Sequence, residues 1–170
     1  GLAFSPDEKK LYVVEWRGTP NRSIWSYDVG ADGMSLTNKT KLIDEVKSYL
    51  WSAAIRDGKI RLSGFVPSEA TRKTVVDAAK AAFPRREIDD RMRLARGAPS
   101  QAQWLAGVNF GLKQLAGLKS GKTDLEGLDL AIEGEAQDFN AFKGVRTALS
   151  GGLPQGVKLK NERVTPPVVQ

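Results

Sequence analysis

The segment Lys59-Ile60-Arg61-Leu62-Ser63-Gly64-Phe65-Val66 decides the fold, because its apolar residues alternate with basic or polar ones. Successive side chains of a strand point to opposite faces, so this alternation predicts a strand with one buried face and one wet face. The dipeptide Asp57-Gly58 lies directly before it, and Asp-Gly between two strand patterns is the strongest short hairpin signal. We therefore expect a hairpin whose first strand is Trp51-Ser52-Ala53-Ala54-Ile55-Arg56.

A helix and a returning strand are predicted after this hairpin. Ser68 follows Pro67 and can cap the helix, since a serine hydroxyl accepts a backbone N–H bond at that position. The helix extends to about Phe83, where Pro84 ends it, and its apolar stripe consists of Val75, Val76, Ala79 and Phe83. A strand over residues 87–94 then closes the unit.

The chain repeats itself weakly at an offset of seventy residues. Ile60 aligns with Leu130, Gly64 with Gly134, and Pro84 with Pro154. Such spacing is typical of duplicated structural units. The second unit predicts a helix capped by Ser100, strands at 122–126 and 128–136, a helix capped by Asp138, and a last strand over 157–165. Glycine inside a strand usually marks a close approach, and we expect the crossing helix to pack against Gly64 and Gly134.

These patterns predict an α+β fold with three parts. Residues 1–45 form a short all-β hairpin segment, residues 46–99 a first (α)ββαβ unit, and residues 100–170 a second. Each unit is expected to pack its helices on a small mixed sheet. The sequence leaves open whether the two units share one continuous sheet.

The first part is predicted to contain strands at 10–15 and 24–29, a turn at 30–33, and a third strand that starts at Leu42. The stretch Gly1-Leu2-Ala3-Phe4-Ser5-Pro6-Asp7-Glu8-Lys9-Lys10-Leu11-Tyr12-Val13, with Trp25-Ser26-Tyr27-Asp28-Val29, resembles the SMP-30/gluconolactonase β-propellers. This resemblance implies little more than one blade of a propeller. The metal ligands of that family lie outside such a segment, so none is assigned here, and Glu15 and Asp28 are interpreted as strand-end and turn residues.

Composition excludes several kinds of chemistry. The chain has no Cys and no His, which rules out disulfides, thiol catalysis and imidazole-based triads. No apolar run approaches the length that a transmembrane helix needs. We expect no catalytic residues, no metal and no cofactor.

The net charge of +6 is concentrated in the middle of the chain. Residues 45–114 carry thirteen bases and seven acids, whereas acids and bases balance on both sides of that stretch. A local basic surface attracts anionic surfaces such as phospholipid headgroups. The candidate binding residues are Arg85, Arg86, Arg91, Arg93 and Arg96. Cations at a helix end also favour the helix dipole, and this structural role for Arg85 and Arg86 stays open.

Most of the chain, about residues 46–170, resembles the tandem BON-domain region of OmpA-family envelope proteins. The resemblance lies in three stretches: Trp51-Ser52-Ala53, Leu62-Ser63-Gly64-Phe65-Val66-Pro67-Ser68-Glu69-Ala70, and Asp90-Arg91-Met92-Arg93-Leu94-Ala95-Arg96-Gly97-Ala98-Pro99. It extends through Trp104-Leu105, Ile132-Glu133-Gly134-Glu135-Ala136 and Pro166-Pro167-Val168-Val169. The resemblance implies a non-catalytic module in the periplasm or cell envelope of a Gram-negative bacterium, which binds anionic phospholipid or scaffolds an envelope protein. A fragment of a metal-dependent lactone hydrolase and a purely structural spacer are the alternatives, and no oligomeric state is indicated.

Four other patterns carry less weight. Gly117-Leu118-Lys119-Ser120-Gly121-Lys122-Thr123 resembles a phosphate-binding loop, but it lies between a helix and a strand in the wrong order. Glu133 and Glu135 share a strand face without a partner base. The basic region lacks exposed aromatic residues for stacking, so no nucleic-acid binding is expected. The helix around Gly107 and Gly111 is predicted to pack inside the protein, with binding to a membrane surface through Trp104, Phe110 and Leu112 as the alternative.

Overall fold

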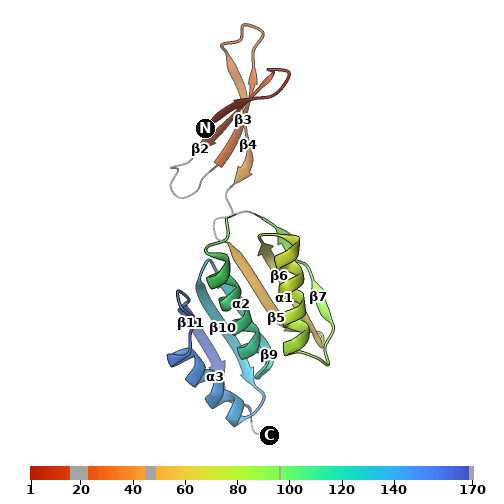
Figure 1. Cartoon of the computed structure of the whole chain (residues 1–170), viewed down its shortest axis with the longest axis vertical. Coiled ribbons are helices and arrows are strands. Elements are labelled where there is room, and N and C mark those ends of the chain that lie inside the picture. Colours follow the sequence, from red (N-terminus) through yellow and green to blue (C-terminus); the bar gives the residue numbers. More distant parts are fainter. Residues whose placement is uncertain (16–22, 45–48, 96, 169–170) are drawn as a thin grey trace. The chain divides into compact units, whose positions relative to one another are not determined.

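A computed structural model describes residues 1–15, 23–44, 49–95 and 97–168 (Figure 1). The chain divides into two compact units, Gly1–Ser48 and Tyr49–Gln170. The boundary predicted between residues 45 and 46 lies outside the described residues.

The first unit is a four-stranded antiparallel sheet rather than the predicted hairpin. Its strands follow chain order: β1 (Leu2–Phe4), β2 (Lys10–Glu15), β3 (Ser23–Val29) and β4 (Leu36–Asp44). Leu42 was expected to start a strand, but β4 begins six residues earlier, at Leu36. The turn before β4 is closed by Asp32, whose carboxylate accepts the backbone N–H groups of Ser35 and Met34; these bonds lower the pKa of Asp32 to about 2.

The second unit contains one large sheet and three helices among its described residues. The elements are β5 (Leu50–Arg56), β6 (Lys59–Val66), α1 (Glu69–Ala82), β7 (Ile88–Asp90), β8 (Arg93–Leu94), α2 (Gln101–Leu115), β9 (Leu118–Glu126), β10 (Asp129–Ala136), α3 (Phe139–Gly151) and β11 (Lys158–Thr165). The strand order is β11-β10-β9-β5-β6-β7, and β8 also pairs with β6.

The predicted fold class, α+β with two repeated (α)ββαβ units whose helices pack on small mixed sheets, is wrong. The protein is mostly β, with 43% strand against 28% helix, and its sheets have four and seven strands. The reason is that β5 pairs antiparallel with β9, residues Leu50–Ile55 against Gly121–Glu126. Strand edges are rows of unpaired N–H and C=O groups, and this pairing joins two such edges. All strands from 50 to 165 therefore belong to one sheet.

Within this sheet, β6 and β10 lie seventy residues apart and have the same alternation of buried and partly exposed residues. Gly64 (φ +90°) faces Trp51 on β5, and Gly134 (φ +150°) faces Gly121 on β9. The expectation that a helix packs against these glycines is wrong. A Cβ on Gly64 would lie 2.1 Å from the carbonyl oxygen of Leu50, and one on Gly134 would lie 2.1 Å from that of Ser120. The close neighbour is the backbone of the partner strand.

The local signals of the sequence explain where the helices and strands begin and end. Asp57 and Gly58 both have positive φ, as a tight hairpin turn between β5 and β6 requires. Ser68 caps α1 by accepting the N–H of Thr71, as predicted, and Asp138 caps α3 in the same way. Ser100 precedes α2 but its side chain makes no capping bond. The strand predicted over 87–94 is divided in two, because the Asp90 carboxylate accepts the N–H of Met92 and turns the chain there.

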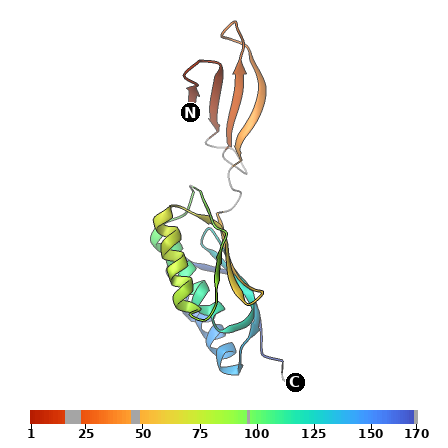
Figure 2. The same cartoon turned by 90° about the vertical axis from the view of Figure 1, so that its right-hand side faces the viewer.

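All three helices lie on one face of the seven-stranded sheet (Figure 2). The core between helices and sheet contains fully buried side chains such as Trp51, Leu62, Trp104 and Leu125. Gly107 and Gly111 let α2 approach β9, since a Cβ at either position would lie 3.0 Å from Leu125 or Thr123. This confirms internal packing of α2. The alternative of membrane contact through α2 is wrong, because Trp104 and Leu112 are buried against the sheet.

Asp89 ties the short edge strand β7 to its neighbour. Its carboxylate accepts the Nε–H of Arg61 on β6 at 2.9 Å and that of Arg91 at 3.1 Å. The hydrogen bond from Arg61, followed by that from Arg91, lowers the pKa of Asp89 below its ordinary value. A carboxyl group with a lowered pKa in the folded protein stabilises it only while ionised.

We predict that Gly134→Ala destabilises the protein by about 2 to 3 kcal/mol, because alanine is strained at this positive φ and meets the backbone of Ser120. Gly144 is the control, since a Cβ there contacts nothing within 4 Å and the residue lies inside α3. Gly144→Ala should raise stability by about 0.5 to 1 kcal/mol. Urea unfolding measures both variants, and equal effects would contradict the close approach of β9 and β10.

We predict that Asp89→Asn lowers the urea midpoint at neutral pH, because the lost charge no longer holds Arg61 and Arg91. The stability from Asp89 is present above its unfolded pKa and is lost as the pH falls through the lowered folded pKa. The difference between wild type and variant should therefore shrink as the pH falls below the ordinary pKa of an aspartate. Asp129→Asn, at a residue without an ion pair among the described residues, is the control. A difference that persists unchanged in acid would contradict this role.

Candidate binding surfaces

The seven-stranded sheet separates the charged residues of the second unit into two surfaces. One is the outer side of the helices and their ends, and the other is the sheet face opposite the helices, which we call the open sheet face (Figure 2). On the open sheet face many cations are paired: Lys59 with Glu87, Arg61 with Asp89, and Lys122 with Asp124. Cations that have no such partner attract an external anion most strongly.

Arg85 and Arg86, two of the predicted binding residues, lie in the turn that follows α1. Arg85 is exposed and Arg86 is half-buried. Neither side chain makes a hydrogen bond or an ion pair with any described residue. The turn is held by the backbone alone, with Phe83 accepting the N–H of Arg86 at 3.1 Å. Both guanidinium groups are therefore available for contact with a ligand.

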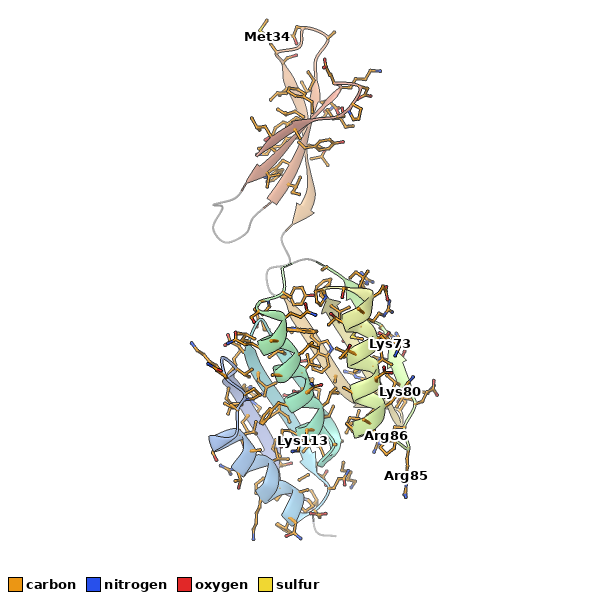
Figure 3. The ribbon with its side chains drawn as sticks, in the orientation of Figure 1. Met34, Lys73, Lys80, Arg85, Arg86 and Lys113 are labelled. Atoms are coloured by element: carbon orange, nitrogen blue, oxygen red, sulfur yellow. The ribbon has the colours of Figure 1, made fainter. Side chains whose placement is uncertain are left out.

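Two lysines that the sequence analysis did not select lie at the same end of the unit. Lys80 is in the last turn of α1 and Lys113 in the last turn of α2. Both are exposed and have no ion pair among the described residues. Figure 3 shows them with Arg85 and Arg86 at the C-terminal ends of the two helices. We call these four residues the basic end. The basic residues in the last turns of the two predicted helices are the sequence pattern from which Lys80 and Lys113 could have been selected.

Lys73 lies nearer the N-terminal end of α1 and is already paired with a carboxylate (Figure 3). Its ammonium group donates to Asp77 at 2.8 Å, one turn along the helix. This hydrogen bond is the largest cause that lowers the pKa of Asp77, and the charge of Lys80 contributes less. Arg72 is also paired, with Asp90 at 2.8 Å, and that bond raises its pKa. The outer side of α1 therefore has little free charge before its last turn.

The other predicted arginines do not join the basic end. Arg91 is paired with Asp89, and Arg93 is exposed on β8 opposite Phe65. Arg96 lies outside the described residues. Glu87 bonds to Ile60 near the start of β6, so Arg93 lies about 16 Å farther along that strand at about 3.3 Å per residue. The predicted set is thus spread along the edge of the sheet rather than gathered at one site.

The helix dipole accounts for part of this arrangement. Unpaired carbonyl groups give the C-terminal end of a helix a partial negative charge, which cations of the last turn offset. Lys80 and Lys113 fit that role in α1 and α2. Arg85 and Arg86 lie beyond the last helical residue, Ala82, and the dipole effect falls off within a turn. The structural role that the sequence left open thus suits the lysines better than the arginines.

Three hollows adjoin one another on the open sheet face, around Lys122. Their volumes are about 560, 370 and 120 Å³, and Lys122 lines all three. The floor between them is made of small residues, including Ala54 and Ala131. In the described part of the chain, no three carboxylates gather as a metal site would require.

The described helices include none long and apolar enough to cross a membrane. No family model, no curated protein and no solved structure matches this chain. The two family resemblances of the sequence are therefore predictions, and the surfaces described above are what the structure itself offers to a ligand.

Proposed function

We propose that this chain is a non-catalytic module that binds anionic phospholipid surfaces through the basic end. The observation that carries the proposal is the group of four cations, Lys80, Arg85, Arg86 and Lys113, which lack a carboxylate partner among the described residues and lie at one end of two neighbouring helices (Figure 3). Elsewhere in the described part of this unit, most arginines and lysines are neutralised by a neighbour.

A phospholipid surface suits this group better than a small ligand. The four cations are exposed or half-buried and lie at two helix ends, and none of them lines the hollows described on the open sheet face. A flat anionic surface can contact all of them at once, and each Lys or Arg near such a surface contributes independently. The resemblance to envelope proteins agrees with this assignment and with a location in the periplasm or cell envelope. A scaffolding role beside an envelope protein would use the same surface.

We predict that Arg85→Gln/Arg86→Gln weakens binding to vesicles containing phosphatidylglycerol about twenty-five-fold, from about fivefold for each arginine. Co-sedimentation at low and high salt measures the partition coefficient. Wild-type binding should fall as salt screens the charges and should be much weaker on phosphatidylcholine vesicles.

The control is Lys143→Gln/Arg163→Gln, which removes the same charge from two exposed residues without ion pairs elsewhere in the unit. It should bind almost as wild type does. Equal loss in both variants would mean that net charge alone matters. If wild type binds neither vesicle, the proposal fails and a structural spacer becomes the better hypothesis.

A further inference from the structure

The strand register of the open sheet face places residues in rows across the sheet. One row is Asp89, Arg61, Ala54, Lys122, Glu133 and Arg163, on six successive strands. The neighbouring row contains Ser63, Ser52, Asp124 and Ala131. Each row crosses the sheet at right angles to the strands, and adjacent strands lie about 4.8 Å apart. Side chains of one row therefore stand next to one another.

The small side chain of Ala54 leaves a gap between two cations of the first row. Arg61 on β6 and Lys122 on β9 are its direct neighbours, so their backbones are about 9.6 Å apart with only a methyl group between them. Arg56 stands two residues along β5 and so faces the same side. The space above the methyl group is a hollow of about 370 Å³, lined by Ser52, Ala54, Arg56, Arg61, Ser63, Lys122 and Asp124. We call it the Ala54 hollow.

The residues that line the Ala54 hollow include more cations than carboxylates. Three cations line it, and Asp124 is the one carboxylate among its lining residues. Asp124 also accepts the Ser52 hydroxyl at 2.5 Å and the Lys122 ammonium at 3.2 Å. Arg56 is exposed and has no hydrogen bond or ion pair with any described residue. Cations therefore outnumber carboxylates by two among the lining residues, while Asp89 and Glu133, which do not line this hollow, are paired with Arg61 and Lys122.

Arg61 and Lys122 are held by carboxylates, of which only Asp124 lines the hollow. Asp89 and Glu133 lie on the far side of each from Ala54, according to the register. Arg61 donates to Asp89 through Nε, which leaves its terminal N–H groups out of that bond. The hydrogen bond to Asp124 raises the pKa of Lys122 and keeps it charged. Guanidinium and ammonium groups held around a gap form an arrangement that binds phosphate oxygens.

We propose that the Ala54 hollow binds the phosphate group of a phosphomonoester, with Arg56, Arg61 and Lys122 as its ligands. A phosphomonoester carries close to two negative charges at neutral pH and three acceptor oxygens, which suits a site lined by three cations. The group can come from a soluble phosphorylated molecule or from a lipid headgroup such as phosphatidic acid. This site lies on the open sheet face, not at the helix ends, so it is independent of the phospholipid binding proposed for the basic end.

Titration with inorganic phosphate and with glycerol phosphate, followed by backbone amide NMR shifts, tests the site in the whole chain. Saturable shifts are expected for residues 52–56, 61–63 and 122–124. Arg56→Gln should weaken binding about tenfold, as expected for loss of one charged hydrogen-bonding partner. Ala54→Glu, which fills the gap with a carboxylate, should abolish binding.

Two controls carry the same charge changes outside the hollow. Arg163→Gln lies in the same row two strands beyond Lys122, and Thr165→Glu lies on the edge strand β11. Both should bind phosphate as wild type does, and amide spectra verify the fold of every variant. Shifts that do not saturate, or binding that survives in Ala54→Glu, would overturn the proposal.

Vesicles containing phosphatidic acid distinguish the two sources of the phosphate group. If Ala54→Glu loses binding to soluble phosphate but binds these vesicles normally, the ligand is a soluble phosphomonoester. If the vesicle binding falls as well, the hollow accepts a headgroup. Either result supports the site, whereas Ala54→Glu that binds both soluble phosphate and the vesicles as wild type does contradicts it. The Arg85→Gln/Arg86→Gln variant should bind soluble phosphate normally, which separates this site from the basic end.

Discussion

The pairing of β5 with β9 is the interaction on which the second unit depends. It joins the strands on either side of α2 into one sheet, with six residues of each strand in register. Without it, each half would present a bare strand edge, and such edges invite pairing with other chains. The central helix α2 covers this junction, because Gly107 and Gly111 let it lie close to β9. Strand pairing and helix packing thus stabilise the same place.

Both candidate binding surfaces follow from this single sheet. The helices α1 and α2 cover the same face and end at the same end of the unit, which brings their free cations together (Figure 3). Because the other face is left open, its side chains form rows of paired charges. The two surfaces use charge differently: the basic end is a projecting group suited to a flat anionic surface, whereas the Ala54 hollow encloses a gap suited to one phosphate group.

The sequence predicted features that depend on neighbours along the chain. Alternation located β6 and β10, Asp57-Gly58 marked the hairpin turn, and Ser68 and Asp138 capped their helices. It could not predict which strand edges join, because alternation shows which face is buried and not what lies beside a strand. For the same reason it missed the Ala54 hollow, since the importance of a small residue there depends on Arg61 and Lys122 across the strands. It selected Arg85 and Arg86 but grouped them with Arg91 and Arg93, which lie elsewhere.

The most direct test of the single sheet is a search for nuclear Overhauser effects between backbone Hα protons of residues 50–55 and 121–126 in the whole chain. Antiparallel strands bring the Cα atoms of alternate pairs to about 4.5 Å, close enough for strong cross-strand signals. Such signals are expected at alternate pairs of the register that joins Ala53 to Thr123. If these signals are absent while the cross-strand signals of β5 with β6 and of β9 with β10 are present, the two halves form separate sheets.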